Sequence, residues 1–483
     1  MAKVHLIYFD LYTGYYPSFH HGLAYIIGTL KEDNHSVCFS HLKTEKDIAT
    51  LKDRLSSEKT DIVGLSFTTN QKKYVRSLLK NMPLTGQFLI AGGVHCTLVK
   101  EKIFEEFPDI DGICVGEGEI PLRELCRKIN AKKDYTQTQN FYFRSEKGII
   151  KNVIKLNEDV DSLALPDYSL FDYRKIIEES GGFFPMFLTR GCPYDCHYCC
   201  NHVLREAYEN KTQYVRFFLP HVAIKIVKNN LSLYRAAKSI GFSDDTFTLN
   251  KKWLLEFCKL YKEEINLPFL CNARVETIDD EIVRSLKSAG CFSIEFGVES
   301  GNEWLRQYIL NRRHSNKEIE NAFLTVTKYG VKTLSYNMFG LPFETKEMQS
   351  DTLNFNFKIR PNLGKCYYFY PYPGTKLYNL CNDYELSLDN LEERSGYLEG
   401  PTLKEIFVLD RETISNYRRL QLYFYLRLLC SKIAFFGLLE KPLYAVLSLF
   451  NACFAFLANS SSKDSFFARQ RLFIRKLVLK YLR

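Results

Sequence analysis

The chain has 483 residues, and its sequence lacks the features of a secreted or membrane-spanning protein. Its first residues, Met1 to Ile7, form too short an apolar run for a signal peptide, so we expect a reducing, cytoplasmic location. The run from Leu443 to Ala458 has 16 residues, whereas a spanning helix needs roughly 20. A hydrophobic content of 46% with 25% charged residues indicates two to four globular domains.

An excess of charge is also missing from most of the chain, although the whole carries +9. From Arg411 to the end there are 13 Lys and Arg against 3 Asp and Glu. The other 410 residues therefore sum to −1, and the basic character belongs to the tail alone. This distribution gives no support to nucleic-acid binding by the body of the protein.

Cysteine is plentiful, with 15 residues, an odd number that argues against a full set of disulfides. Cys192, Cys196 and Cys199 follow an apolar run with the spacing C-x3-C-x2-C. Three thiolates on one loop can hold three irons of a four-iron cluster and leave the fourth iron open to another ligand. A closed zinc site wants four ligands, often in paired C-x2-C motifs, and the sequence has no second pair. His197, Cys200 and His202 lie close enough to keep a zinc knuckle as the weaker alternative.

Residues 1–140 alternate short apolar strands with amphipathic helices, which predicts a doubly wound parallel sheet of Rossmann type. The expected strands are 4–9, 36–40, 61–67, 88–93 and 112–116, and the expected helices are 22–30, 46–55 and 72–80. Ligands of such sheets bind beyond the carboxyl ends of the strands. Small and polar residues occupy those ends, namely Ser66, Thr68, Thr69, Gly92, Gly93, His95, Gly116, Glu117, Gly118 and Glu119. Any one of these glycines is more often an ordinary turn residue than a ligand contact.

Residues 141–183 read as a linker with a small hairpin around Gly148, and Gly181-Gly182 marks the entry to the next domain. Residues 184–385 alternate again, which predicts a βα barrel. Its expected strands are 239–245, 269–274, 293–301, 333–339 and 367–370. Polar residues at their carboxyl ends would build an active site: Asp244, Asp245, Arg274, Glu299 and Ser300. Helix capping by the carboxylates and a structural ion pair for Arg274 are the plainer alternatives.

The cysteine loop, Thr189-Arg190-Gly191-Cys192-Pro193-Tyr194-Asp195-Cys196-His197-Tyr198-Cys199, resembles that of the radical S-adenosylmethionine (SAM) enzymes. The resemblance implies a 4Fe–4S cluster on Cys192, Cys196 and Cys199, with SAM on the fourth iron and an external electron donor. It also implies that the barrel of residues 184–385 is a partial one of six βα units. It further implies SAM contacts from Tyr198, Asp244, Asp245, Arg274, Glu299, Ser300 and Gly340, the last in Gly340-Leu341-Pro342. Cys200 has no counterpart among the ligands, and we expect it to pack.

The first domain resembles the cobalamin-binding domain that precedes many radical SAM barrels. The resemblance is carried by Gly92-Gly93-x-His95-x-Thr97, Val115-Gly116-Glu117-Gly118-Glu119 and Pro17-x4-Gly22. It implies that the strand-end residues of residues 1–140 contact cobalamin. A D-x-H-x2-G motif, which supplies a histidine ligand to cobalt elsewhere, is missing, so we expect neither His20 nor His21 on cobalt.

Residues 386–483 are expected to form a helical, basic C-terminal domain. Basic residues at 469, 476, 480 and 483 share one helical face, which predicts peripheral contact with an anionic membrane. A helical cap over the barrel mouth is an equal alternative, and either would suit an apolar or lipid-like small-molecule substrate.

The resemblances together imply a cobalamin-dependent radical SAM methyltransferase. It would methylate an unactivated carbon by means of a 5′-deoxyadenosyl radical and methylcobalamin. A cobalamin-dependent radical SAM cyclase or ring-rearranging enzyme is the first alternative. A non-catalytic sensor that binds a metal or cobalamin is the second.

Overall fold

The computed structural model describes residues 1–11, 19–57, 59–80, 82, 86–234, 237–389, 391 and 402–404. The predicted tail elements from Arg411 onward and Pro17 of the first-helix motif lie outside these residues. Within the described part of the chain, no helix combines the length and apolar character that crossing a membrane requires.

The first sheet has the strand order β2-β1-β3-β4-β5-β6-β7. Strands β1 to β5 pair in parallel, as predicted, and order 2-1-3-4-5 is that of a doubly wound fold. The order reverses between β1 and β3, and ligands of such folds bind at this point. The parallel strands are β1 (Lys3–Phe9), β2 (Ser36–Leu42), β3 (Ile62–Ser66), β4 (Phe88–Gly92) and β5 (Gly112–Cys114).

Helices cover both faces of this sheet. Strand β1 is therefore buried on both faces along nearly its whole length. Leu23 and Leu122, from helices α1 and α6, share a core with Leu6 on one face. Ile48 and Val75, from helices α2 and α3, pack with Ile7 on the other. The helices are α1 (His21–Glu32), α2 (Glu45–Ser57), α3 (Lys72–Leu79), α4 (Val94–Val99), α5 (Ile103–Glu106) and α6 (Glu119–Asn130), with short turns η1 (Thr69–Gln71) and η2 (Lys100–Lys102).

The hairpin expected in the linker forms, but it continues the first sheet. Strand β6 (Phe141–Ser145) pairs antiparallel with β5, and β7 (Gly148–Lys151) pairs antiparallel with β6. The edge of β5 would otherwise expose unpaired backbone groups, and the hairpin covers it. The rest of the connection contains η3 (Val160–Ser162) and α7 (Tyr173–Glu179).

The second sheet has six strands in the order β15-β14-β13-β12-β11-β8, and every neighbouring pair is parallel. This is the predicted partial (β/α)6 barrel. Its strands are β8 (Phe183–Met186), β11 (Ser239–Phe242), β12 (Phe269–Ala273), β13 (Cys291–Glu299), β14 (Lys332–Phe339) and β15 (Leu363–Tyr368). Its helices are α8 (Asn201–Glu206), α9 (Pro220–Leu233), α10 (Lys251–Glu264), α11 (Asp280–Ser288), α12 (Asn316–Lys328), α13 (Lys346–Ile359) and α14 (Lys376–Asp383). Shorter elements are β9 (Thr189–Arg190), β10 (Arg216–Phe217), η4 (Val275–Thr277) and the π-helical turn η5 (Leu305–Ile309).

The prediction of the last strand was wrong in position. Strand β15 begins at Leu363 and ends at Tyr368, so Phe369 and Tyr370 follow the strand instead of belonging to it. The run of aromatic residues 367–370 suggested a strand, but β15 pairs with β14 through the mixed segment Leu363–Tyr368. The aromatic side chains are thereby placed at and beyond the carboxyl end of the strand, where barrel active sites lie.

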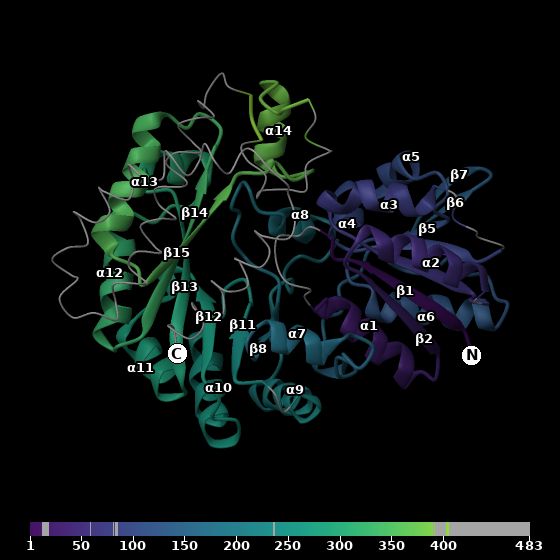
Figure 1. Ribbon diagram of the computed structural model, residues 1–483, viewed down its shortest axis with the longest axis horizontal. Helices are drawn as coiled ribbons and strands as arrows, with labels where there is room; N and C mark the ends of the chain where they lie inside the picture. Colours follow the sequence, from purple (N-terminus) through teal and green to yellow (C-terminus); the bar gives the residue numbers. More distant parts are fainter. Residues whose placement is uncertain are drawn as a thin grey trace.

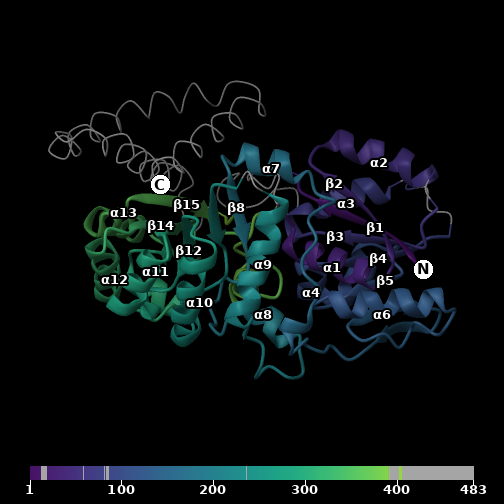
Figure 2. The ribbon, with the colours of Figure 1, turned by 90° about the horizontal axis from the view of Figure 1, so that it is seen from below.

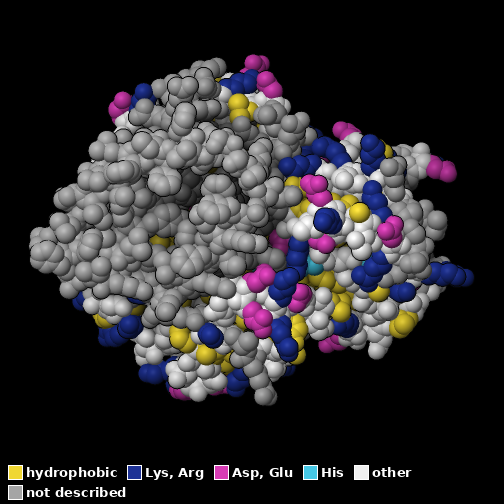
Figure 3. Space-filling model, viewed as in Figure 1, with side chains coloured by type: hydrophobic (Ala, Val, Ile, Leu, Met, Phe, Trp, Pro, Cys, Tyr) yellow, Lys and Arg dark blue, Asp and Glu magenta, His cyan; other side chains and the backbone are white. Residues whose placement is uncertain are grey.

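One apolar core joins the two sheets. Phe19, before helix α1, lies 5.1 Å from Phe184 of β8, and Tyr25 of α1 stacks on Phe218 at 6.1 Å between ring centroids. Figure 1 shows the two sheets side by side with α8 between them, and Figure 2 shows α7 and α9 beside β8 at the boundary. On the face seen in Figure 3, basic and acidic side chains are interspersed over the N-terminal unit.

Candidate active site

The three cysteines of the C-x3-C-x2-C motif lie on the irregular loop between β9 and α8. Cys192 and Cys196 are buried, and Cys199 is half-buried. Gly191 has a φ of +81°, and a Cβ there would lie 2.4 Å from the carbonyl oxygen of Tyr214, so the loop needs glycine at this point. Among the described residues, no group of three His, Cys, Asp or Glu side chains converges as the ligands of a single metal ion do.

Two buried arginines flank Cys196. Arg274, after β12, donates from Nη1 to the sulfur at 3.4 Å, and its guanidinium lies 3.6 Å over the ring of Tyr194. Arg312 donates to the same sulfur from Nη1 at 3.9 Å. Two guanidinium groups therefore donate to one sulfur, which holds Cys196 in place within the loop. The sequence pointed to Arg274 from its strand end, whereas Arg312 lies on a loop that no motif marks.

Glu299 and Tyr198, two predicted SAM contacts, lie in contact with each other. Tyr198 Oη donates to Glu299 Oε1 at 2.9 Å, and Arg312 Nη1 donates to Tyr198 Oη at 3.2 Å. Glu299 has a φ of +64°, next to a register shift in strand β13, and such strained residues gather at functional sites. A Cβ on Gly297 would lie 2.4 Å from Glu299 Oε1, so glycine makes room for this carboxylate. Burial raises the pKa of Glu299, although the charge of Arg312 acts against it.

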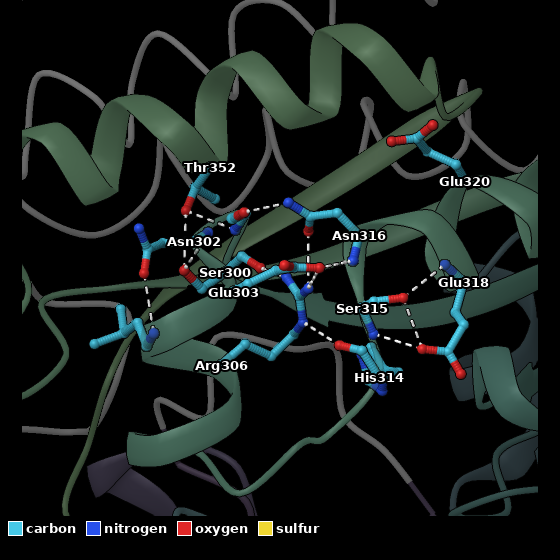
Figure 4. A network of polar contacts seen from close by, with 12 residues as sticks. Ser300, Asn302, Glu303, Arg306, His314, Ser315, Asn316, Glu318, Glu320 and Thr352 are labelled. Atoms are coloured by element: carbon cyan, nitrogen blue, oxygen red, sulfur yellow. Dashed lines mark hydrogen bonds and ion pairs between the residues drawn. The ribbon is translucent and has the colours of Figure 1, made fainter.

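A polar network holds the loop that carries Arg312 (Figure 4). Arg306, whose side chain is fully buried, donates to the carbonyl oxygens of Ser300 and His314 at 2.6 and 3.2 Å. It also donates to Asn316 Oδ1 at 2.8 Å. Residues 300, 314 and 316 are thus tied to one side chain, and the intervening loop is fixed at both ends. Burial lowers the pKa of Arg306 to about 10.

Ser300, a predicted SAM contact, has hydrogen-bond partners within the barrel. Its side chain is fully buried, and its Oγ lies 3.3 Å from Thr352 Oγ1 of helix α13. It also accepts a hydrogen bond from the backbone N–H of Asn302. These contacts place its hydroxyl against helix α13, and its contact with SAM stays a prediction.

The two neighbouring aspartates after β11 have different surroundings. Asp244 Oδ1 accepts hydrogen bonds from the N–H groups of Leu188 and Thr189 at 2.8 and 2.6 Å and from the Thr189 hydroxyl. Burial raises the pKa of Asp244 to about 7. Asp245 instead lines the cavity between the two sheets. Asp244 therefore holds residues 188 and 189, which precede the cysteine loop, by hydrogen bonds. Of these two aspartates, Asp245 is the one that lines a cavity.

Gly340 begins a turn that a buried carboxylate closes. Glu344 Oε2 accepts hydrogen bonds from the N–H groups of Gly340 and Leu341 at 2.7 and 3.3 Å, and Gly340 has a φ of +73°. Burial raises the pKa of Glu344 to about 8. Sequence reasoning singled out the glycine and missed the glutamate that shapes the turn.

A cavity of about 260 Å³ opens at the carboxyl ends of β13 to β15. Tyr198 and Glu299 form part of its wall, so it adjoins the cysteine loop. The other lining residues had no predicted role, and four of them form the aromatic run at 367–370. They are Tyr336, Met338, Tyr367, Tyr368, Phe369, Tyr370 and Tyr372. An aromatic wall with one carboxylate suits a ligand with a flat ring and hydroxyl groups.

A larger cavity of about 390 Å³ lies between the first sheet and the cysteine loop. The predicted cobalamin contacts in its wall are Ser66, Gly92, Gly93, Gly116, Glu117, Gly118 and Glu119. Its deep end is apolar and reaches Leu6, Gly64 and Ile90 within the sheet. Gly93 and Gly116 have φ values of +98° and +85°, which a side chain would strain. The cavity runs over the switch point between β1 and β3.

Three predicted cobalamin contacts, Thr68, Thr69 and His95, are not among the residues that line this cavity. His95 is fully buried, with Nδ1 bonded to Thr69 Oγ1 at 3.0 Å and Nε2 3.4 Å from Glu106 Oε2. Thr68 caps the short turn η1. The helix that begins at Val94 carries His95 into the core beside Phe67.

His20 and His21 both line the cavity. His20 caps helix α1, with Nδ1 accepting from the Leu23 N–H at 3.0 Å and Nε2 lying 3.0 Å from Ser66 Oγ. His21 Nδ1 lies 2.6 Å from Tyr168 Oη. Burial lowers the pKa of His20 to about 4 and that of His21 to about 3, so both rings are neutral at physiological pH.

Buried polar atoms without a hydrogen-bond partner gather around the cysteine loop, within the described part of the chain. They are His202 Nδ1 and Nε2, Asp244 Oδ2, Arg274 Nε and Arg312 Nε. Buried polar groups normally have partners, so this gathering fits a site that takes a polar ligand. The thiols, the flanking guanidiniums and the two cavities match the donor set that a cluster with two further cofactors needs.

Two family models match the chain, and together they cover more than half of it. The Radical SAM superfamily model matches residues 186–355, and the B12 binding domain model matches residues 13–126. A radical SAM domain implies a 4Fe–4S cluster and SAM, and a B12-binding domain implies cobalamin.

Among curated proteins, the chain is 26% identical over 416 residues to an uncharacterised methyltransferase of Pyrococcus horikoshii, which covers 84% of this chain and 87% of that protein. It is also 26% identical over 387 residues to the anaerobic magnesium-protoporphyrin IX monomethyl ester cyclase of Cereibacter sphaeroides. That match covers 75% of this chain and 60% of the cyclase.

Two solved structures share the fold. The cobalamin-dependent SAM radical enzyme OxsB, with aqua-cobalamin and SAM bound, has a TM-score of 0.68 at 16% identity over 100% of this chain and 84% of its own. The radical SAM methyltransferase TsrM from Kitasatospora setae has a TM-score of 0.64 at 15% identity over 78% of this chain and 75% of its own. The two family matches thus place a B12-binding domain in front of a radical SAM domain, which is the domain arrangement of a cobalamin-dependent radical SAM enzyme.

Proposed function

We propose that this enzyme transfers a methyl group to an unactivated carbon of a small-molecule substrate. The observation that carries the proposal is the position of the cysteine loop between two cavities. Gly191, at the start of the loop, lines the cavity on the B12-binding side, and Tyr198, near its end, lines the aromatic cavity of the barrel. If SAM and cobalamin occupy these two cavities, one loop adjoins both of them, as a reaction that uses both in one cycle requires.

Cys192, Cys196 and Cys199 would hold the cluster. Tyr198 and Glu299, with the aromatic residues of the smaller cavity, would hold SAM, and Asp245 would face the ligands from the larger one. The glycines at the ends of β4 and β5 would let cobalamin approach the backbone closely. When bound, the cluster and SAM supply a hydrogen-abstracting radical, and cobalamin supplies the methyl group.

The protein contributes position and exclusion of water. The guanidiniums of Arg274 and Arg312 hold the sulfur of Cys196, and Asp244 fixes Leu188 and Thr189 ahead of the loop. The apolar deep end of the larger cavity and the tyrosine wall of the smaller one limit water near the reacting groups. Neither positioning nor the exclusion of water requires a side chain to gain or lose a proton.

Methyl transfer is favoured by the naming of the Pyrococcus horikoshii relative and of TsrM as methyltransferases. The Cereibacter sphaeroides relative is equally identical and is named a cyclase, so ring formation is the second candidate function. The two candidates differ in whether the methyl group of SAM leaves SAM and reaches cobalamin.

The experiment uses full-length protein that has been reconstituted anaerobically with iron, sulfide and hydroxocobalamin. SAM labelled in its methyl group is added with a reductant, and label on cobalamin and 5′-deoxyadenosine are both measured. Label on cobalamin together with 5′-deoxyadenosine supports methyl transfer. 5′-Deoxyadenosine without label on cobalamin favours the cyclase function. Cys196→Ala should abolish 5′-deoxyadenosine, and Cys200→Ala should leave it unchanged.

A further inference from the structure

Four charged side chains connect the B12-binding domain to the base of the cysteine loop. Glu117 lies on the turn between β5 and α6, Glu119 is the first residue of α6, and Arg190 and Arg216 lie on the two-stranded sheet of β9 and β10. Arg190 Nη2 donates to Glu119 Oε1 at 2.6 Å, and Arg190 Nη1 lies 3.1 Å from Glu117 Oε1. Arg216 donates to both oxygens of Glu117, from Nη1 at 2.9 Å and from Nη2 at 2.7 Å.

The two arginines are direct cross-strand partners in this small sheet. Like charges directly opposite each other on paired strands repel, so the pairing of β9 with β10 needs a negative charge between them. Glu117 supplies it, because its carboxylate contacts both guanidiniums. The B12-binding domain therefore contributes the group that allows two strands of the barrel domain to pair.

The four side chains are largely removed from water. Their exposed fractions are 16% for Arg190, 7% for Arg216, 18% for Glu117 and 6% for Glu119. In such surroundings the loss of one charge leaves an uncompensated partner, which is far more costly than the loss of a surface pair. Two positive and two negative charges balance within the group.

Neighbouring contacts fix the same turn and the same strand. The N–H of Glu117 donates to Tyr208 Oη at 2.9 Å, and a Cβ on Gly116 would lie 2.6 Å from that oxygen. The guanidinium of Arg190 lies 5.0 Å from the ring centroid of Tyr25 on helix α1. Arg190 is separated from Cys192 only by Gly191, so a shift of Arg190 would shift the first cysteine of the motif.

We propose that Glu117, supported by Glu119, is a positioning residue that holds the cysteine loop at a fixed distance from the B12-binding domain through Arg190 and Arg216. The proposal rests on the proposed function, since the distance matters because two cofactors must cooperate. It also gives the glutamates of the Gly116-Glu117-Gly118-Glu119 motif a role other than the predicted contact with cobalamin, because their carboxylates are engaged by arginines.

The first test is hydrogen–deuterium exchange of the full-length chain without cofactors. Glu117→Gln keeps the shape of the side chain and removes its charge, and Glu105→Gln, an exposed carboxylate of the same domain, is the control. We expect peptides covering residues 189–199 and 214–218 to exchange about tenfold faster or more in Glu117→Gln and at the wild-type rate in Glu105→Gln. Equal rates in all three proteins would overturn the proposal. If Glu117→Gln does not fold, exchange is measured in Glu119→Gln, which removes only one of the two partners of Arg190. The proposal then requires faster exchange of the same peptides in Glu119→Gln than in the wild-type protein.

The second test uses reconstituted protein and the magnetic interaction between Co(II) cobalamin and the reduced cluster in electron paramagnetic resonance spectra. We expect Glu117→Gln to retain its iron and cobalamin but to show a weaker and more broadly distributed interaction. Full retention of the wild-type interaction would contradict a positioning role. Wild-type protein that takes up no cobalamin would instead contradict the proposed function, while the exchange result would still stand.

Discussion

At the scale of single residues, Cys196 differs from the other two cysteines of the motif in its charged neighbours. Arg274 and Arg312 both donate to its sulfur, and both are buried. Net charge and hydrogen bonds to the sulfurs set the reduction potential of iron–sulfur clusters. The two arginines should therefore make the cluster easier to reduce.

Replacing Arg312 by glutamine should lower the reduction potential of the reconstituted cluster, because a positive charge near a thiolate ligand is lost. We expect a shift on the order of 30–100 mV to more negative values. Arg313→Gln is the matched control, since Arg313 is the next residue and is exposed. The shift is measured by redox titration, with the reduced cluster detected by electron paramagnetic resonance. Equal potentials for the two variants would show that Arg312 does not affect the cluster.

Glu344 gives the protein a pH-dependent stability of predictable sign. Burial raises its pKa from 4.5 to about 8 in the folded chain. A raised folded pKa means that the stabilisation is complete below the unfolded pKa and is lost as the pH rises through the folded value. Between about pH 6 and about pH 9, the free energy of unfolding of the wild-type protein should therefore fall by on the order of 1–3 kcal/mol relative to that of Glu344→Gln. Thermal unfolding of both proteins across this range checks the prediction, and parallel curves would contradict it.

At the scale of elements, strand ends and the loops that follow them build the site. The π-helical turn η5 and residues 310–315 bring Arg312 from the end of β13 to the cysteine loop. Arg306 ties this segment together through the hydrogen bonds shown in Figure 4. The segment is therefore rigid for a structural reason that its sequence does not display.

Arg306→Gln should destabilise the protein by about 2–4 kcal/mol, because buried carbonyl oxygens lose their donor. Arg284→Gln, on the exposed face of α11, should be close to neutral. Urea unfolding of both variants gives the free energies. A cost for Arg306→Gln below about 1 kcal/mol would show that the network does not hold the loop.

The sequence was sufficient to predict those parts of the fold that depend on patterns between residues close together in the chain. The alternation of strands and helices predicted both parallel sheets, and the spacing of the cysteines predicted one loop for all three. Strand β11 ends at Phe242, before Asp244 and Asp245, so strand alternation could not tell which of the two aspartates faces a cavity. The pattern also did not separate His95 from its neighbours: Gly92 and Gly93 line the cavity, whereas His95, on helix α4, is buried and does not line it.

Contacts between distant segments could not be predicted in this way. The pairing of Arg190 with Arg216 depends on strands 26 residues apart, and Glu117 lies 99 residues before Arg216. No local periodicity records such distances. The aromatic cavity likewise assembles residues from β13, β14, β15 and the cysteine loop.

At the scale of the whole molecule, the B12-binding domain and the barrel share one apolar core, which includes Tyr25, Phe184 and Phe218. The larger cavity is lined from both sides of this boundary. Binding in it should therefore stabilise both domains together, and not the first alone.

Addition of hydroxocobalamin to the full-length protein should raise the temperature of a single unfolding transition. At a concentration of about one hundred times Kd, the stabilisation should be about 2.7 kcal/mol. Calorimetry measures it, with protein unfolded before addition as the control. Two transitions, of which only one moves, would contradict the shared core.

The most direct measurement is the content of iron and cobalamin after anaerobic reconstitution of the full-length chain and removal of excess cofactor. The account predicts about four irons and about one cobalamin per chain. It also predicts that Cys192→Ala loses the iron, while Cys200→Ala keeps it. Iron without cobalamin would leave a radical SAM enzyme but contradict methyl transfer through the larger cavity, and the absence of both would contradict the account as a whole.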